Sequence, residues 1–265
     1  MKSIYQELVQ NAFEAMAEGD YEEALSLSGQ AISEDEDEPE AFIIAGAALL
    51  EMARYEEAVR FLEQGLIRAP EDAECQAMLG FGYFSLWNFE MAELAIEGAL
   101  RRDVRLAEAH YWWGLLLERQ GRFLEAEEAI YRAYLLSPRH FPLPFRVPRE
   151  AFRRSVEEAI MMLPAGMIRA LSELTIYISD FPSATLPGEE GVDPLISGLF
   201  SGIPRENAEP FPLVPDNRIY LFQRNIERVA TDHAELVEEI RQTLEREVGF
   251  YLGLSSDGVG EEGFA

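Results

Sequence analysis

Residues 73–106 read AECQAMLGFGYFSLWNFEMAELAIEGALRRDVRL, and residues 107–140 follow with AEAHYWWGLLLERQGRFLEAEEAIYRAYLLSPRH. Both segments carry a glycine, an aromatic residue and an alanine at matching places, and the same step of 34 residues extends toward the start of the chain. The step relates three sets of residues: Ala24, Ala58, Ala92 and Ala126; Ala12, Gly46, Gly80 and Gly114; and Tyr21, Tyr55, Phe89 and Phe123. Three sets in phase predict a tandem repeat of helix pairs, in which small residues at the helix crossing let the backbones approach closely.

This pattern resembles the tetratricopeptide repeat, a helix-turn-helix unit of the same period. The four repeats span residues 5–38, 39–72, 73–106 and 107–140, and the second and fourth end near Pro70 and Pro138. The first repeat lacks the glycine and the terminal proline, as expected of an end repeat. The resemblance covers just over half of the chain and implies an all-α solenoid of about four helix pairs.

The resemblance also implies a binding surface, because in that family the first helix of each repeat lines a concave groove. Ligand contacts commonly fall at the second, fifth, ninth and twelfth positions of that helix. Here these positions are largely apolar with acidic edges, and the candidate partner-binding residues are Phe13, Ile43, Phe81, Phe84, Tyr111 and Leu115. No Lys, Asn or Arg occupies them, which argues against the carboxylate clamp of chaperone-binding members.

Composition and charge exclude several classes of function. The net charge is −27, and acidic residues run without interruption from Glu34 to Glu38. Such a chain repels phosphate backbones and anionic lipid surfaces, so neither nucleic acid nor a membrane is an expected partner. We find no apolar run long enough to span a bilayer and no secretory signal. The single cysteine, Cys75, has no partner for an internal disulfide, and we expect a reducing, bacterial-type cytoplasm.

The repeat pattern stops after residue 140, and residues 141–148 form a proline-rich linker that we expect to pack on the solenoid. In the remaining domain, 149–265, the sequence predicts a helix over about 149–163, strands over 174–178 and 218–222, a long loop over 180–217, and a helix over about 232–252. Thr231 or Asp232 caps the last helix, and Gly253 ends it.

This second part resembles the small bacterial zincin-like metallopeptidases, on the residues Leu163-Pro164, Gly198 to Pro204 and Ile219 to Phe222. That family carries His-Glu-x-x-His-x-x-Gly-x-x-Asp on its last helix, where two histidines one turn apart hold zinc and the glutamate acts as general base. The matching positions here are Arg246, Glu247, Phe250 and Gly253, followed by Ser256 and Asp257. Neither histidine is present. A guanidinium presents only donors and a phenyl ring has no ligand atom, so we predict no metal, no cofactor and no catalytic residue.

The sequence therefore predicts a non-catalytic protein-protein interaction protein or scaffold, whose apolar groove binds a peptide or partner protein. Glu247 reads as an ordinary charged position on the helix surface. Three alternatives stay open. Glu247 and Asp257 could serve as non-standard ligands of an active peptidase. The groove could instead be filled by the chain's own C-terminal domain or by a second copy. The cleft of the zincin-like domain, which lacks its zinc ligands, could bind a peptide without cutting it.

Overall fold

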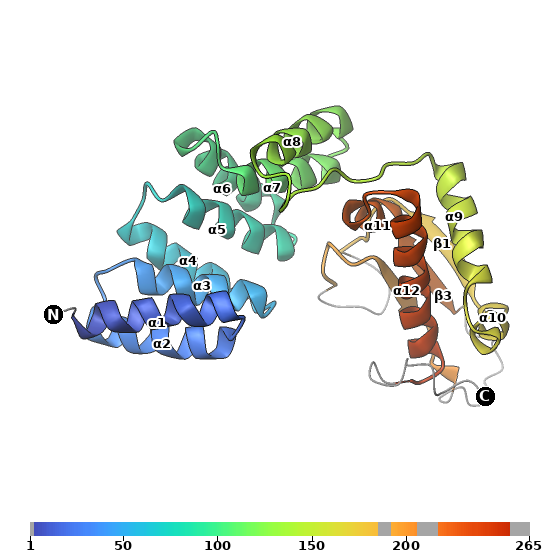
Figure 1. Ribbon diagram of the computed structural model, residues 1–265, viewed down its shortest axis with the longest axis horizontal. Helices are drawn as coiled ribbons and strands as arrows, with labels where there is room; N and C mark the ends of the chain where they lie inside the picture. The colour runs from blue at the N-terminus through green and yellow to red at the C-terminus, as the bar shows by residue number, and fades with distance from the viewer. Residues whose placement is uncertain (1–2, 185–191, 206–216, 255–265) are drawn as a thin grey trace. The chain divides into compact units, whose positions relative to one another are not determined.

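We describe a computed structural model over residues 3–184, 192–205 and 217–254 (Figure 1). The chain divides into two compact units, Met1–Phe141 and Pro142–Ala265. We call them the solenoid unit and the C-terminal unit and describe each by itself. No helix in the described ranges is long and apolar enough to cross a membrane.

The solenoid unit consists of four helix pairs, as the repeat predicts. Each pair begins with the helix that carries the small-residue position and continues with the helix that opens on the aromatic residue. The helices are α1 (Ile4–Glu18), α2 (Tyr21–Glu34), α3 (Glu40–Glu51), α4 (Tyr55–Arg68), α5 (Ala73–Ser85), α6 (Phe89–Arg102), α7 (Ala107–Arg119) and α8 (Phe123–Leu136). Successive pairs stack on one another, α2 on α3, α4 on α5 and α6 on α7 (Figure 1).

The repeated small residues lie where neighbouring helices touch. All four repeated alanines are fully buried. At Gly80, a Cβ atom would lie 2.5 Å from Cγ1 of Ile96, and at Gly114 it would lie 2.6 Å from Cγ1 of Ile130. Only glycine allows this approach without moving a fully buried neighbour.

The turn inside each helix pair repeats as well. Gly19, Ala53, Trp87 and Gly121 stand 34 residues apart, and all four have positive φ angles of 80°, 55°, 60° and 74°. Glycine adopts this left-handed conformation without penalty, whereas alanine and tryptophan do so at a cost of about 1 kcal/mol or more. The backbone geometry of the turn is therefore kept even where the residue type disfavours it.

The C-terminal unit combines helices with a three-stranded sheet. Its helices are α9 (Arg149–Met161), α10 (Ala165–Leu171), α11 (Gln223–Val229) and α12 (His233–Tyr251), and its strands are β1 (Thr175–Ser179), β2 (Gly198–Ser201) and β3 (Arg218–Phe222). The strand order is β1-β3-β2, with β1 parallel and β2 antiparallel to β3. Helix α12 packs against α9 and against β2 and β3 (Figure 1). The Asp232 side chain accepts from Glu235 N and caps α12, as the sequence predicts.

Three short elements of this unit differ from the sequence prediction. The segment around β2 was expected to be part of a long loop, and α10 and α11 were not expected at all. Each has only four to seven residues, which is too short for an apolar period to appear. The approach of α12 explains the glycine that opens β2, because a Cβ atom at Gly198 would lie 2.5 Å from Cγ2 of Thr243.

The linker also differs from expectation, since most of it packs on the C-terminal unit. Phe141 does contact the solenoid, with its ring 4.8 Å from that of Tyr111. By contrast, Phe145 and Val147 pack against the core of the C-terminal unit, and Phe145 N donates to the carbonyl oxygen of Ala230 at 2.8 Å. The expectation that the linker packs on the solenoid was therefore wrong beyond its first residue, because the apolar side chains find their partners in the domain that follows.

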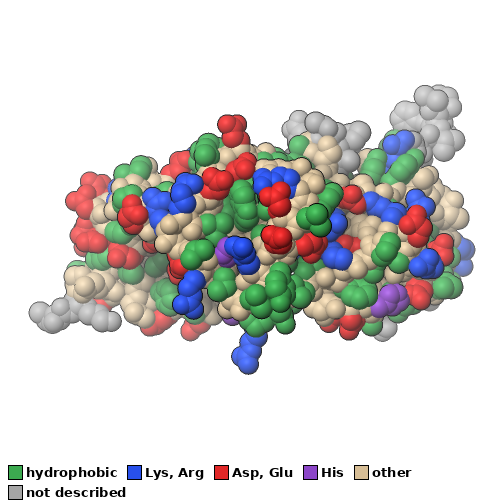
Figure 2. Space-filling model, turned by 90° about the horizontal axis from the view of Figure 1, so that it is seen from above, with side chains coloured by type: hydrophobic (Ala, Val, Ile, Leu, Met, Phe, Trp, Pro, Cys, Tyr) green, Lys and Arg blue, Asp and Glu red, His purple; other side chains and the backbone are tan. Residues whose placement is uncertain are grey.

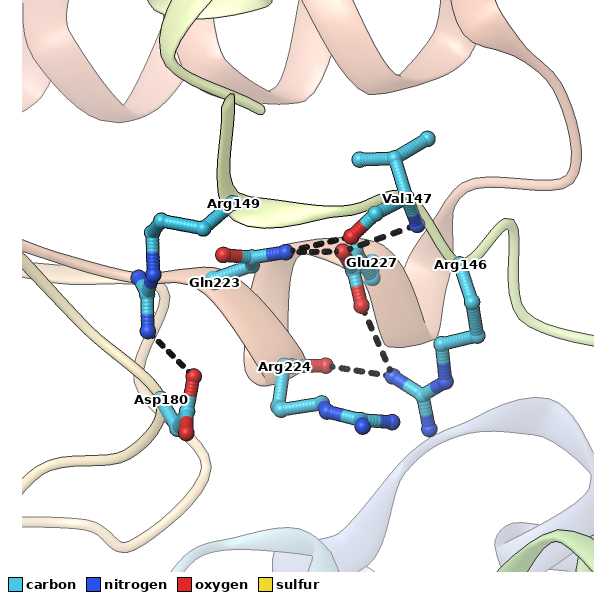
Figure 3. Close-up of polar contacts among 7 residues, drawn as sticks. All are labelled: Arg146, Val147, Arg149, Asp180, Gln223, Arg224 and Glu227. Atoms are coloured by element: carbon cyan, nitrogen blue, oxygen red, sulfur yellow. Dashed lines mark hydrogen bonds and ion pairs between the residues drawn. The ribbon is translucent and has the colours of Figure 1, made fainter. Parts of the chain in front are cut away.

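Buried polar side chains of α11 hold the linker in place (Figure 3). Glu227 is buried and accepts from Val147 N at 3.2 Å and from Gln223 Nε2 at 2.5 Å. The guanidinium of Arg146 lies against both Glu227 Oε2, at 3.4 Å, and the carbonyl oxygen of Arg224, at 3.2 Å. A buried carboxylate is stable only when it is paired and hydrogen-bonded, and this one has both a cation and neutral donors.

Candidate binding groove and the zincin-like helix

The N-terminal part of the groove presents exposed apolar side chains. Phe13 on α1 is 64% exposed, and Ile43 on α3 is partly exposed. Together with Val9, Ile44 and three polar residues, they line a hollow of about 360 Å³. Two of the predicted contact residues, Phe13 and Ile43, therefore share one surface.

Aromatic rings lie together further along the repeats, at and beside contact positions that the sequence predicts for the C-terminal part of the groove. Phe81 on α5 stacks on Trp112 of α7, with ring centroids 4.1 Å apart, and meets the ring of Tyr55 at 5.9 Å. Tyr111 meets Trp112 edge to face at 5.3 Å. These four rings are all partly exposed. The sequence analysis named Phe81 and Tyr111 but missed Trp112, because it lies one position beyond the contact positions that the resemblance implied; its place beside another aromatic residue was the available signal.

Two predicted contact residues are not on the surface. Phe84 is 0% exposed and Leu115 is 2% exposed, so neither offers area to a ligand. Phe84 packs against the rings of Phe89 and Trp112 and lies beneath the Arg119 guanidinium. These two positions were wrong as contact residues, because their side chains are buried within the solenoid.

Carboxylates lie along the edge of the groove. Glu40 accepts from the Tyr5 hydroxyl at 3.1 Å, and Glu108 lies near the Trp112 indole nitrogen, at 3.4 Å. Burial raises the pKa of the Glu108 carboxyl, and the negative charges of Glu74 and Glu51 raise it further, against the opposing hydrogen bond from Trp112. Figure 2 shows many further Asp and Glu side chains over the N-terminal repeats, at the left of the view.

In the C-terminal unit, the residues at the zinc-ligand positions serve other contacts. Arg246 and Phe250 lie one turn apart on α12 with about half of each side chain exposed. Glu247 between them is only 3% exposed, accepts from Phe200 N at 2.8 Å and pairs with Arg246 Nε at 2.9 Å. The interpretation of Glu247 as an ordinary surface glutamate was wrong.

The hydrogen bond from Phe200 has a consequence for the sheet edge. Phe222 N donates to the carbonyl oxygen of Ser197 at 2.9 Å, and bonded pairs alternate along an antiparallel ladder, so Phe200 N faces away from β3. Since β2 is an edge strand, this N–H would otherwise be open to an added strand. The Glu247 carboxylate accepts the hydrogen bond from this N–H instead.

The residues do not fit a zinc ion. Zinc sites need at least three Cys, His, Asp or Glu ligands, and no such group of three lies together in the described ranges. The two candidate positions on α12 hold a guanidinium and a phenyl ring, and the carboxylate between them is engaged in two hydrogen bonds. Ser256 and Asp257, at the third-ligand position, lie outside the described residues.

Comparison with known families agrees with both resemblances. A tetratricopeptide repeat model matches residues 15–80, and a zincin-like metallopeptidase model matches residues 171–263. The prediction of an all-α repeat solenoid followed by a small α+β zincin-like domain is confirmed.

Individual proteins are similar to parts of the chain. Superkiller complex protein 3 of Mus musculus is 30% identical over 94 residues, which are 36% of this chain and 6% of the mouse protein, so the chain spans only a small part of that relative. Among solved structures, MamA matches 52% of this chain and 75% of its own, with 20% identity and a TM-score of 0.46. YrrB, a TPR protein with an unusual peptide-binding site, matches 49% of this chain and 68% of its own, with 22% identity and a TM-score of 0.43.

Proposed function

We propose that this protein is a non-catalytic interaction scaffold that binds a peptide segment or a partner protein through the groove of its repeats. The observation that carries the proposal is the exposed Phe13 beside Ile43, at a hollow of about 360 Å³ on the first helices of the repeats. A soluble protein rarely leaves a contiguous apolar surface bare, and such grooves receive the apolar side chains of a helix or an extended segment.

The rings further along the groove extend this surface. Phe81, Trp112 and Tyr111 are held by contacts with one another, so they lose little freedom when a ligand binds. Rigid, partly exposed aromatic rings are the side chains most often found at the centre of binding surfaces. We therefore propose Phe13, Ile43, Phe81, Trp112 and Tyr111 as the contact residues.

The test of binding uses the full-length protein immobilised against a displayed library of random twelve-residue peptides. The variant Phe13→Ser removes an exposed groove ring, and Leu124→Ser is the matched control, because Leu124 is 84% exposed on the second helix of the fourth repeat. We expect peptides that the wild type and Leu124→Ser retain and Phe13→Ser loses. If every retained peptide binds all three proteins equally, the groove is not the binding surface.

The same test distinguishes an open groove from one that is already filled. A groove filled by the C-terminal unit or by a second copy would retain no groove-dependent peptide, which would overturn the proposal in favour of a structural role. Circular dichroism of both variants checks that their helical content is unchanged. Exposed substitutions of this kind usually change stability by less than about 0.5 kcal/mol.

The non-catalytic part of the proposal rests on the contacts of Glu247, whose carboxylate is buried and bound to Phe200 N and Arg246. A general base needs its carboxylate free to take a proton from water. The test is elemental analysis of the untagged protein, where we expect less than about a tenth of an equivalent of zinc. Near-stoichiometric zinc, with peptidase activity lost in Glu247→Gln, would replace this proposal by the peptidase alternative.

A further inference from the structure

The Glu108 carboxylate lies at the aromatic part of the groove, beside the Trp112 indole, and two carboxylates from other helices act on it. Glu51 ends α3, Glu74 lies in the first turn of α5 and Glu108 in the first turn of α7. Glu51 and Glu74 lie close enough to Glu108 for their charges to act on its ionisation. Within the described part of the chain, none of the three forms an ion pair, and the hydrogen bond from the Trp112 indole is the one polar side-chain contact that Glu108 makes.

This lack of cations contrasts with other acidic positions on the repeats. Glu57 pairs with Arg54 at 2.8 Å, and Glu125 pairs with Arg122 at 2.5 Å, both within single helix turns. Arginine is therefore placed beside carboxylates elsewhere on the solenoid but not at this part of the groove. Glu108 is partly buried, whereas Glu51 and Glu74 are exposed. Their negative charges disfavour the ionised form of Glu108, and a cation brought by a ligand relieves that repulsion.

The rings beside the carboxylates favour the same ligand chemistry. Trp112 lies against both Glu108 and Phe81, so the two rings and the Glu108 carboxylate form one continuous surface. Lysine and arginine side chains make two kinds of contact with such a surface. The aliphatic part packs on a ring, and the charged end contacts the π face of a ring or the carboxylate. An acidic or phosphorylated segment would meet only repulsion here.

We propose that the groove binds a basic segment, in which Lys or Arg side chains alternate with apolar ones. The apolar side chains of this segment contact Phe13 and Ile43, and its cations contact Glu51, Glu74 and Glu108 beside Trp112. The inference rests on the proposed function, since it names the chemistry of the partner that the groove takes. The net charge of −27 adds long-range attraction for the same class of partner.

The first experiment reads the composition of the groove-dependent peptides, meaning those that Phe13→Ser loses and Leu124→Ser keeps. We expect Lys and Arg to be enriched severalfold over the starting library, and Asp and Glu to be depleted. Groove-dependent peptides without this enrichment would overturn the inference while the proposed function stands. An absence of groove-dependent peptides would overturn both.

The second experiment tests whether the three carboxylates act locally. One groove-dependent basic peptide is labelled, and its binding to the full-length protein is measured by fluorescence polarisation. A version with citrulline for Arg and acetyllysine for Lys keeps the length and removes the charge. We expect the double variant Glu74→Gln with Glu108→Gln to weaken binding of the basic peptide at least tenfold and to leave the neutral version unchanged.

A matched control separates this local effect from general attraction. The double variant Glu56→Gln with Glu90→Gln removes the same charge from exposed positions on the second helices of the second and third repeats. We expect it to weaken binding less than threefold. Equal weakening by both double variants would show that only the overall charge matters, and it would overturn the assignment of the cation site to the groove.

Discussion

Replacing Glu247 by alanine tests the claim that the zincin-like helix uses this glutamate for structure. The carboxylate is 3% exposed and accepts from Phe200 N at 2.8 Å, so alanine leaves a buried donor of the edge strand without a partner. Such a loss costs about 1–3 kcal/mol. The bond to Arg246 adds less than about 1 kcal/mol, because half of the arginine side chain is exposed and screened. We expect the C-terminal unit to melt about 4–12 °C lower.

The assay exploits the placement of the fluorophores. Trp87, Trp112 and Trp113, the three tryptophans of the chain, all belong to the solenoid unit. Tryptophan fluorescence therefore follows the solenoid, while hydrogen exchange of peptides from β2 and α12 follows the C-terminal unit. We expect faster exchange in those peptides and an unchanged tryptophan transition.

The conservative variant Glu247→Gln provides the control, since the amide oxygen can still accept from Phe200 N and the side chain keeps its volume. We expect it to lose less than half as much stability as Glu247→Ala. If alanine changes stability by less than about 0.5 kcal/mol, the ordinary range of a surface substitution, the carboxylate is not the partner of the edge strand and the reasoning fails.

Three further predictions concern the repeats and the degenerate motif. Gly80→Ala should destabilise the solenoid by about 1–2 kcal/mol in urea unfolding followed by tryptophan fluorescence, because its Cβ would lie 2.5 Å from Ile96 and the clash outweighs the gain in helix propensity. Arg246→His combined with Phe250→His should bind zinc only weakly in calorimetry, because two imidazoles one turn apart on an exposed helix face supply two of the three ligands that a zinc site needs, and either single variant should show no binding. Glu108→Gln should stabilise the solenoid more at about pH 7 than at about pH 4. The pKa of the Glu108 carboxyl is raised in the folded protein, so this residue lowers stability only at pH values where it is ionised in the unfolded chain. An equal gain in the free energy of unfolding at both pH values would contradict this.

The repeat architecture could be predicted because the same physical constraints recur four times. A helix crossing that admits only a small residue and a turn that requires a left-handed residue return every 34 residues, so the sequence records them redundantly. The turn also shows where redundancy helps, because Ala53 and Trp87 give no local signal for positive φ and only their alignment with Gly19 and Gly121 does.

The C-terminal unit was less predictable because its decisive interactions are single and distant in sequence. Glu227 and Gln223 are polar residues that are buried by contact with a linker about 80 residues earlier. The local periodicity of the sequence cannot predict such burial. Glu247 is similar, since its partner Phe200 lies 47 residues away. In the groove, Phe84 was misassigned for a related reason: the contact positions were carried over from a family pattern, and the packing of Phe84 against Phe89 and Trp112 in this chain buries it.

Glu108 connects the stability of the solenoid with its proposed use. Burial and two neighbouring carboxylates raise its pKa, so the ionised form is disfavoured in the folded protein without a ligand. A neutral glutamine could still accept from the Trp112 indole, and local folding alone would favour it. The charge therefore costs stability in the unbound solenoid. Under the proposed function, a cation of the bound segment would offset this cost, so that the unpaired carboxylates of the free protein would contribute affinity for a basic partner.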